Sequence, residues 1–167
     1  MGKRSVRENK NIYQISREEA GLTREKAEEL LGYVSAERIE KIESEKSLPH
    51  PDEVLAMAQC YKVPTLCNYF CTHECPIGEK YVNEVSYKDL SQITLETLAS
   101  LNALDKVKNR FIEITVDGVI SEDEAKDFKK ISDELNKISS TVDSLKLWVE
   151  HTIVTGQIDK TWFEGNS

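Results

Sequence analysis

The chain has 167 residues and carries 22 Lys and Arg against 30 Asp and Glu, a net charge of −8. Hydrophobic residues make up 39% of it, which is enough for the core of one domain or two small ones and excludes a disordered or fibrous protein. No stretch approaches the roughly 20 apolar residues of a membrane span, and no apolar run follows the N-terminal charges. We therefore expect a cytoplasmic protein with no membrane association.

The charge is unevenly distributed along the chain. Residues 1–48 hold 10 Lys and Arg and 10 Asp and Glu, so the whole net charge of −8 falls on residues 49–167. Phosphate contacts require cations, which excludes the acidic part as a nucleic-acid surface. The cations near the start of the neutral part are Lys3, Arg4, Arg7, Lys10 and Arg17.

Short helices with short connections are expected between residues 11 and 75. Thr23 and Ser35 are good N-cap residues, Gly21 suits the position after a helix, and Pro51 suits a first turn. Pro64 opens a further helix, and the Pro76–Gly78 segment ends it and marks a boundary. The expected helices span residues 11–20, 24–31, 36–44 and 52–61.

Residues 87–155 predict a hairpin of two long helices joined at Asp117-Gly118. In the second helix the apolar residues recur in steps of three and four, which is the spacing of a heptad seam. Ser121 and Glu124 predict a capping box before this helix, and Gly156 follows its end. A hairpin buries only one seam on each helix, so the remaining apolar surface requires a second copy of the chain or another part of the same chain. The seam residues are Phe128, Ile131, Leu135, Ile138, Val142, Leu145, Val149 and Ile153.

A motif in residues 10–63 resembles the XRE family of helix-turn-helix domains, the phage Cro and repressor type. The residues that carry the resemblance are Arg17, then Gly21-Leu22-Thr23, the run from Arg24 to Leu31, a turn at Gly32, Ile39-Glu40-Lys41-Ile42-Glu43 and a later Pro49. The resemblance implies a core of crossed helices and a buried, structural Arg17–Glu43 pair. The expected core residues are Leu22, Ala27, Leu30, Ile39 and Ile42.

In this family the third helix, here residues 36–44, enters the major groove of double-stranded DNA. The resemblance therefore implies contacts from that helix, from the start of the preceding helix and from the basic N-terminal arm. The expected DNA-binding residues are Arg24, Ala36, Glu37, Arg38, Glu40, Lys41, Lys3, Arg4 and Arg7. The turn is one residue longer than the family pattern, and carboxylates on the third helix repel phosphates. An acidic protein–protein adaptor built on a helix-turn-helix is therefore the alternative function.

Four cysteines occur at positions 60, 67, 71 and 75. On a continuous helix Cys67, Cys71 and Cys75 would share one face and could bind zinc or an iron–sulfur cluster, which makes a metal- or redox-sensing regulator a further alternative. A buried thiol stripe, a redox-labile pair and a disulfide formed on purification are the other interpretations, and the structural one is favoured.

The sequence thus predicts an all-α protein with a Cro/repressor-like helix-turn-helix bundle followed by a long antiparallel, coiled-coil-like hairpin. The predicted divisions are a helix-turn-helix domain with its cysteine-bearing extension at 8–80, the hairpin at 87–155 and a tail at 156–167. The function expected is that of a DNA-binding transcriptional regulator. Residues 87–155 are expected to form its homodimer. No catalytic residues emerge, so we do not expect an enzyme.

Overall fold

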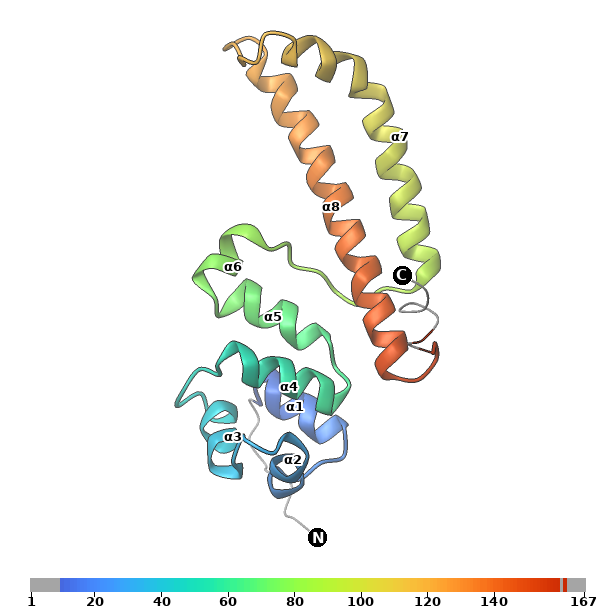
Figure 1. Ribbon diagram of the computed structural model, residues 1–167. Coiled ribbons are helices and arrows are strands. Elements are labelled where there is room, and N and C mark those ends of the chain that lie inside the picture. The colour runs from blue at the N-terminus through green and yellow to red at the C-terminus, as the bar shows by residue number, and fades with distance from the viewer. Residues whose placement is uncertain (1–9, 160, 162–167) are drawn as a thin grey trace. The chain divides into compact units, whose positions relative to one another are not determined.

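The computed structural model describes residues 10–159 and 161, and within these residues it is all helical (Figure 1). This confirms the predicted fold class, with an N-terminal helix-turn-helix series followed by two long helices. The helices are α1 (Ile12–Glu19), α2 (Arg24–Leu31), α3 (Ala36–Glu43), α4 (Pro51–Tyr61), α5 (Thr65–His73), α6 (Pro76–Tyr81), α7 (Leu90–Thr115) and α8 (Ala125–Val154).

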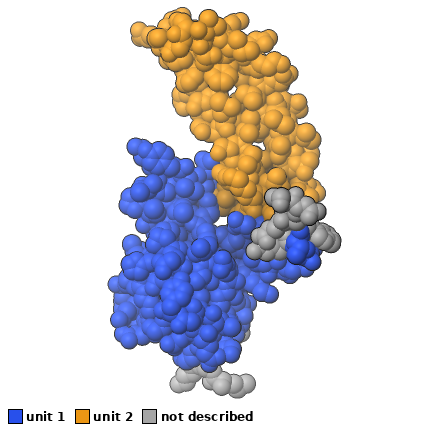
Figure 2. Space-filling model, viewed as in Figure 1, with its two compact units in different colours: residues 1–84, 150–167 blue, residues 85–149 orange. Residues whose placement is uncertain are grey.

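The chain divides into two compact units, shown in Figure 2. One unit contains residues 1–84 and 150–167, and the other contains residues 85–149. The division predicted from the sequence, at 8–80, 87–155 and 156–167, remains a prediction. Among the described residues, no helix combines the length and the hydrophobicity that a membrane crossing requires.

Side-chain caps start the first three helices. The carboxamide oxygen of Asn11 accepts a bond from the Gln14 N–H at 3.0 Å. The hydroxyls of Thr23 and Ser35 accept bonds from the third residue beyond each, both at 3.2 Å. Each cap satisfies a backbone N–H that the first turn leaves without a partner, so the helices begin where these residues predict.

The core of the first unit lies between α1, α2, α3, α4 and α5. Ala27, Ile39 and Ile42 are buried in it, as predicted, but Leu30 is 58% exposed. Leu31 takes its place at 8% exposure, because it lies one helical turn beyond Ala27 on the buried side of α2. The buried hydrophobic residues of this core are Tyr13, Ala27, Leu31, Val34, Ile39, Ile42, Val54, Met57, Ala58, Tyr61, Leu66 and Phe70.

The helix that follows Pro64, α5, ends at His73, just before the Pro76–Gly78 segment, as predicted, but this segment is not itself a loop. Pro76 instead occupies the first position of α6, where its missing N–H costs no helical hydrogen bond. Gly78 is buried, and a Cβ added there would overlap the carbonyl oxygen of Cys71. The glycine therefore permits the close approach of α6 to α5.

The second unit consists of α7 and the part of α8 up to residue 149, which run antiparallel (Figure 1). Near the turn, Arg110 Nε donates to an Asp127 carboxylate oxygen at 3.0 Å, and the rings of Phe111 and Phe128 lie 6.4 Å apart. Glu124 accepts a bond from the Ser121 N–H at 3.1 Å, which is one half of the predicted capping box.

The buried side of the hairpin is partly polar. Ser100, Thr141 and Ser144 are buried there together with Ile93 and Ile131. The Thr141 hydroxyl donates to the Lys137 carbonyl at 2.8 Å, and the Ser144 hydroxyl donates to the Ser140 carbonyl at 2.9 Å. Each of these two hydroxyls is thus satisfied by the preceding turn of its own helix.

Candidate nucleic-acid interface

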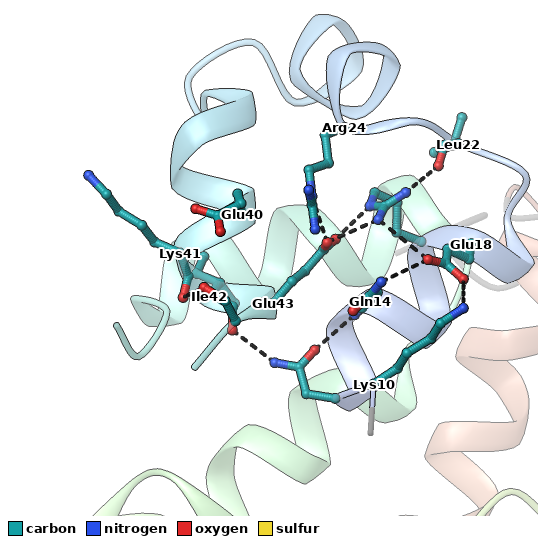
Figure 3. Close-up of polar contacts among 12 residues, drawn as sticks. Lys10, Gln14, Glu18, Leu22, Arg24, Glu40, Lys41, Ile42 and Glu43 are labelled. Atoms are coloured by element: carbon teal, nitrogen blue, oxygen red, sulfur yellow. Dashed lines mark hydrogen bonds and ion pairs between the residues drawn. The ribbon is translucent and has the colours of Figure 1, made fainter. Parts of the chain in front are cut away.

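The position of α3 is fixed at its C-terminal end by a carboxylate between two guanidinium groups (Figure 3). Arg17 on α1 donates from Nε and Nη2 to the two carboxylate oxygens of Glu43, at 2.5 and 2.9 Å. Arg24 on α2 donates from Nε to the same carboxylate at 2.8 Å. The predicted Arg17–Glu43 pair is present, and Arg24 extends it into a link between three helices.

This ion cluster is structural. The Glu43 side chain is 1% exposed and that of Arg17 is 7% exposed, so neither is accessible to a nucleic acid. Burial disfavours the charged form of Arg17, but the hydrogen bonds and charge of Glu43 outweigh it and hold the Arg17 pKa above its usual value. Arg24 is one-third exposed. Among the described residues, its two terminal amino groups have no hydrogen-bond partner, so they are free to bind a phosphate.

Arg38 has a different position from the one expected of a DNA-reading residue. Its guanidinium turns toward α4 and donates from Nε and Nη2 to the Glu53 carboxylate at 2.8 and 2.7 Å. It also donates to the Ser47 hydroxyl at 2.6 Å and the Leu48 carbonyl at 2.9 Å. Glu53 in turn accepts a bond from the His50 N–H at 2.7 Å. Arg38 therefore connects α3, the following loop and the start of α4.

The solvent-facing side of α3 carries the other predicted contact residues. Ala36 and Glu40 are half-buried, and Glu37 and Lys41 are exposed. Lys41 pairs with Glu37 one turn earlier at 2.7 Å. Lys46, in the loop that follows, pairs with Glu40 at 3.0 Å. Figure 3 shows Lys41 projecting away from the buried ion cluster. Exposed pairs of this kind contribute about 0–1 kcal/mol, so an approaching phosphate can displace the carboxylate.

All seven Lys and Arg residues between positions 10 and 48 have a carboxylate partner. Apart from the two terminal amino groups of Arg24, the described surface around α3 therefore offers cations only through exchange of partners. The predicted basic arm of Lys3, Arg4 and Arg7 lies outside the described residues. The pairs are Lys10 with Glu18, Arg17 and Arg24 with Glu43, Lys26 with Glu29, Arg38 with Glu53, Lys41 with Glu37, and Lys46 with Glu40.

The three candidate metal-binding cysteines do not share one helix face. Cys67 and Cys71 lie on α5, but α5 ends at His73, and Cys75 is the N-cap of α6, where its sulfur accepts a bond from the Gly78 N–H. In the described part of the chain, no three His, Cys, Asp or Glu side chains are grouped to hold a metal ion. Burial also raises the pKa of the Cys67 thiol, which disfavours the thiolate that zinc requires.

Three residues of this region were not identified from the sequence. Glu53 anchors Arg38, Val34 in the turn is 1% exposed and completes the core, and the Tyr33 hydroxyl donates to the Asp52 carbonyl at 2.8 Å. Val34 and Tyr33 use the additional residue of the turn to connect it to the core and to α4. An apolar residue in a turn, Val34, was a signal in the sequence that the turn is partly buried. Nothing near Arg38 in the sequence marks Glu53 as its partner.

Residues 14–66 match a family model described as a helix-turn-helix domain. The match runs from α1 into α5 and includes both ion clusters. It confirms the helix-turn-helix resemblance over this segment and is consistent with the XRE type. No curated protein and no solved structure was found to match the chain.

Proposed function

We propose that the chain is a transcriptional regulator of the XRE type, acting in the cytoplasm as a homodimer that binds double-stranded DNA through α3. The helix-turn-helix domain supports DNA binding in general. The observation that carries the proposal is the way α3 is anchored. Its residues Glu43 and Arg38 bind side chains of other helices, and Glu37 and Lys41 face solvent. The proposal includes no catalytic activity.

The roles of the contact residues follow from their chemistry. Lys41 and the free amino groups of Arg24 are suited to phosphate or guanine, and Glu37 can accept a bond from the N4 amino group of cytosine. A base-reading carboxylate on a DNA-facing helix also repels incorrect bases and phosphates, which adds selectivity and lowers affinity. Arg38 is a positioning residue in this scheme, because its donors already bind Glu53, Ser47 and Leu48.

The alternative function is an acidic adaptor that binds another protein. It is favoured by the pairing of Lys41 with Glu37 and of Lys46 with Glu40, which leaves the described surface of α3 without an unpaired cation. The salt response tests the DNA-binding function. Replacement of phosphate counterions makes DNA binding weaken steeply as salt rises.

The test is selection of random duplex DNA by the full-length protein at low and moderate salt, followed by sequencing. We expect enrichment of a palindromic site, because two symmetric copies present two copies of α3. Lys41→Glu should reduce affinity for that site by about tenfold or more, since it replaces an attractive charge with a repulsive one. The matched control is Lys129→Glu, which changes the net charge equally at a side chain that is 77% exposed on α8.

Failure to bind any duplex at low salt would refute the proposal and favour the adaptor. Equal losses from Lys41→Glu and Lys129→Glu would show that net charge, and not contact by α3, governs binding.

A further inference from the structure

A groove of about 490 Å³ lies between α7 and α8 and belongs to the second unit alone. Its volume is within the range of small-molecule sites, which is about 300–1,000 Å³. Among the described residues that line it, Ala99 is the only apolar one. The lining residues are Lys88, Glu96, Ala99, Ser100, Asp133, Asn136, Lys137, Ser140 and Thr141.

Ser100 lines this groove with a hydroxyl that the protein does not satisfy. The residue is only 9% exposed, and within the described part of the chain its side chain has no hydrogen-bond partner. The hydroxyls of Thr97 and Thr141, by contrast, donate to carbonyls of their own helices at 2.7 and 2.8 Å. A buried polar group without a partner is costly, and nearly all such groups bind protein, water or a ligand. Ser100 therefore marks the groove as a place where a polar group from outside the chain is bound.

Asn136 lies across the groove from Ser100. The two helices run antiparallel, and Arg110 contacts Asp127 at 3.0 Å near their turn (Figure 1). Ser100 precedes Arg110 by ten residues, which is about 15 Å of helix. Asn136 follows Asp127 by nine residues, which is about 14 Å, so the two side chains are at nearly the same level. The exposed carboxamide of Asn136 also has no partner among the described residues, so a hydroxyl and an amide are both available here.

An ion pair lies next to these two groups. Lys88 Nζ is 2.7 Å from a carboxylate oxygen of Glu96, and the two side chains are 26 and 36% exposed. Glu96 precedes Ser100 by four residues, which places the pair about 6 Å from Ser100 along α7. A head group that carries an ammonium and a carboxylate on one carbon can bind both partners at once, through charge-assisted hydrogen bonds to Glu96 and Lys88.

The balance of charge in the groove disfavours multiply charged ligands. Two lysines, one glutamate and one aspartate line it, so its net charge is zero. Lys137 pairs with Glu134 at 2.7 Å, and Asp133 pairs with Lys129 at 3.3 Å. A polyphosphate or a polyamine would meet as many like charges as opposite ones. A ligand whose own charges sum to zero is therefore the best match.

We propose that the groove binds a free α-amino acid with an uncharged amide side chain, represented by L-glutamine. Its head group binds the Lys88–Glu96 pair, and its amide exchanges hydrogen bonds with Ser100 and Asn136. The three carbon–carbon bonds of a glutamine side chain span about 4 Å, and a hydrogen bond adds about 3 Å, which together cover the 6 Å between the two parts of the site. This binding does not depend on DNA and is separate from the proposed function.

The experiment is a titration of the full-length protein with L-glutamine, followed by two-dimensional ¹H–¹⁵N NMR without DNA. We expect shifts of the amides of residues 96–100 and 133–141, with a dissociation constant of about 1 mM or lower. L-norleucine has a side chain of the same length without the amide, and L-glutamate adds one negative charge at the same size. Each should bind at least about fivefold more weakly than L-glutamine.

Two variants test the residues that hold the amide. Asn136→Leu replaces the carboxamide by an apolar group of similar size, and Ser100→Ala removes the hydroxyl. Each should raise the dissociation constant for L-glutamine about fivefold. The matched control is Ser91→Ala, an exposed position of α7 outside the groove lining, which should change it by less than about twofold.

Thermal melts show whether the variants fold, and Asn136→Leu carries the test if Ser100→Ala does not, because Asn136 is exposed. Absence of shifts around the groove at about 10 mM L-glutamine overturns the proposal. Equal binding of L-norleucine, or equal losses from Asn136→Leu and Ser91→Ala, overturns it as well.

Discussion

Replacing Arg38 with Ala tests whether this residue positions α3 or reads DNA. The substitution removes four hydrogen bonds and leaves the Glu53 carboxylate, only 11% exposed, without its cation. Hydrogen bonds to charged groups contribute about 1.5–3 kcal/mol each, but they are not additive and the Arg38 side chain is 22% exposed. We expect the local stability of α3 to fall by about 2–3 kcal/mol.

The assay is native-state hydrogen exchange at the amides of Ile39 and Ile42, which reports the free energy of opening α3 itself. A double-mutant cycle with Glu53→Ala should give a coupling energy of about 2 kcal/mol, because either single change breaks the same pair. The control Lys41→Ala removes an exposed pair and should change stability by less than about 0.5 kcal/mol. Arg38→Ala should also leave the salt dependence of DNA binding unchanged.

A loss below about 0.5 kcal/mol, with Arg38→Ala and Glu53→Ala additive, would refute the reasoning. Arg38 would then be free to leave α4 and would again be a candidate for base contact.

Other substitutions and treatments have equally defined outcomes. Glu43→Gln should destabilise the first unit by about 3 kcal/mol, measured by the same exchange method, because it leaves the buried Arg17 charge uncompensated. Gly78→Ala should cost about 2 kcal/mol or more through overlap with backbone, and a melting temperature equal to wild type would contradict this. Cys67 should react with iodoacetamide at pH 8 more slowly than glutathione does, since burial raises its pKa; mass spectrometry of the digested protein measures the rate. The hydrogen bond from Arg38 holds the pKa of Glu53 below its usual range, so its contribution to stability is complete above about pH 4.5 and is lost as the pH falls through the lowered pKa. An acid titration of Glu53→Gln should lack that loss.

Local chemistry explains what the sequence predicted well. Thr23 and Ser35 are the N-caps of α2 and α3. An N-cap bonds a backbone N–H two or three residues later, so the start of a helix can be predicted from a few neighbouring residues. The long helices follow from apolar periodicity for the same reason. The Arg17–Glu43 pair was available only through family resemblance, since 26 residues separate its members.

Two arrangements that the sequence did not predict also have physical causes. Arg38 looks like a free cation on an exposed helix, and only the crossing of α3 and α4 brings Glu53 to it from 15 residues away. Cys75 appears to continue the spacing of Cys67 and Cys71, but the end of α5 at His73 removes it from that face. The position of Arg38 depends on where two helices meet, which no local pattern encodes, whereas Pro76 directly after Cys75 is a local signal that a helix does not continue through Cys75.

The hydroxyl bonds inside the hairpin have a consequence for motion. The bonds of Thr141 and Ser144 run along α8 itself, so sliding α8 past α7 by a fraction of a turn breaks neither of them. The Arg110–Asp127 contact secures the helices near their turn. With the helices secured near the turn, motion of α8 against α7 is a change in the angle between them, and its displacement grows with distance from the turn.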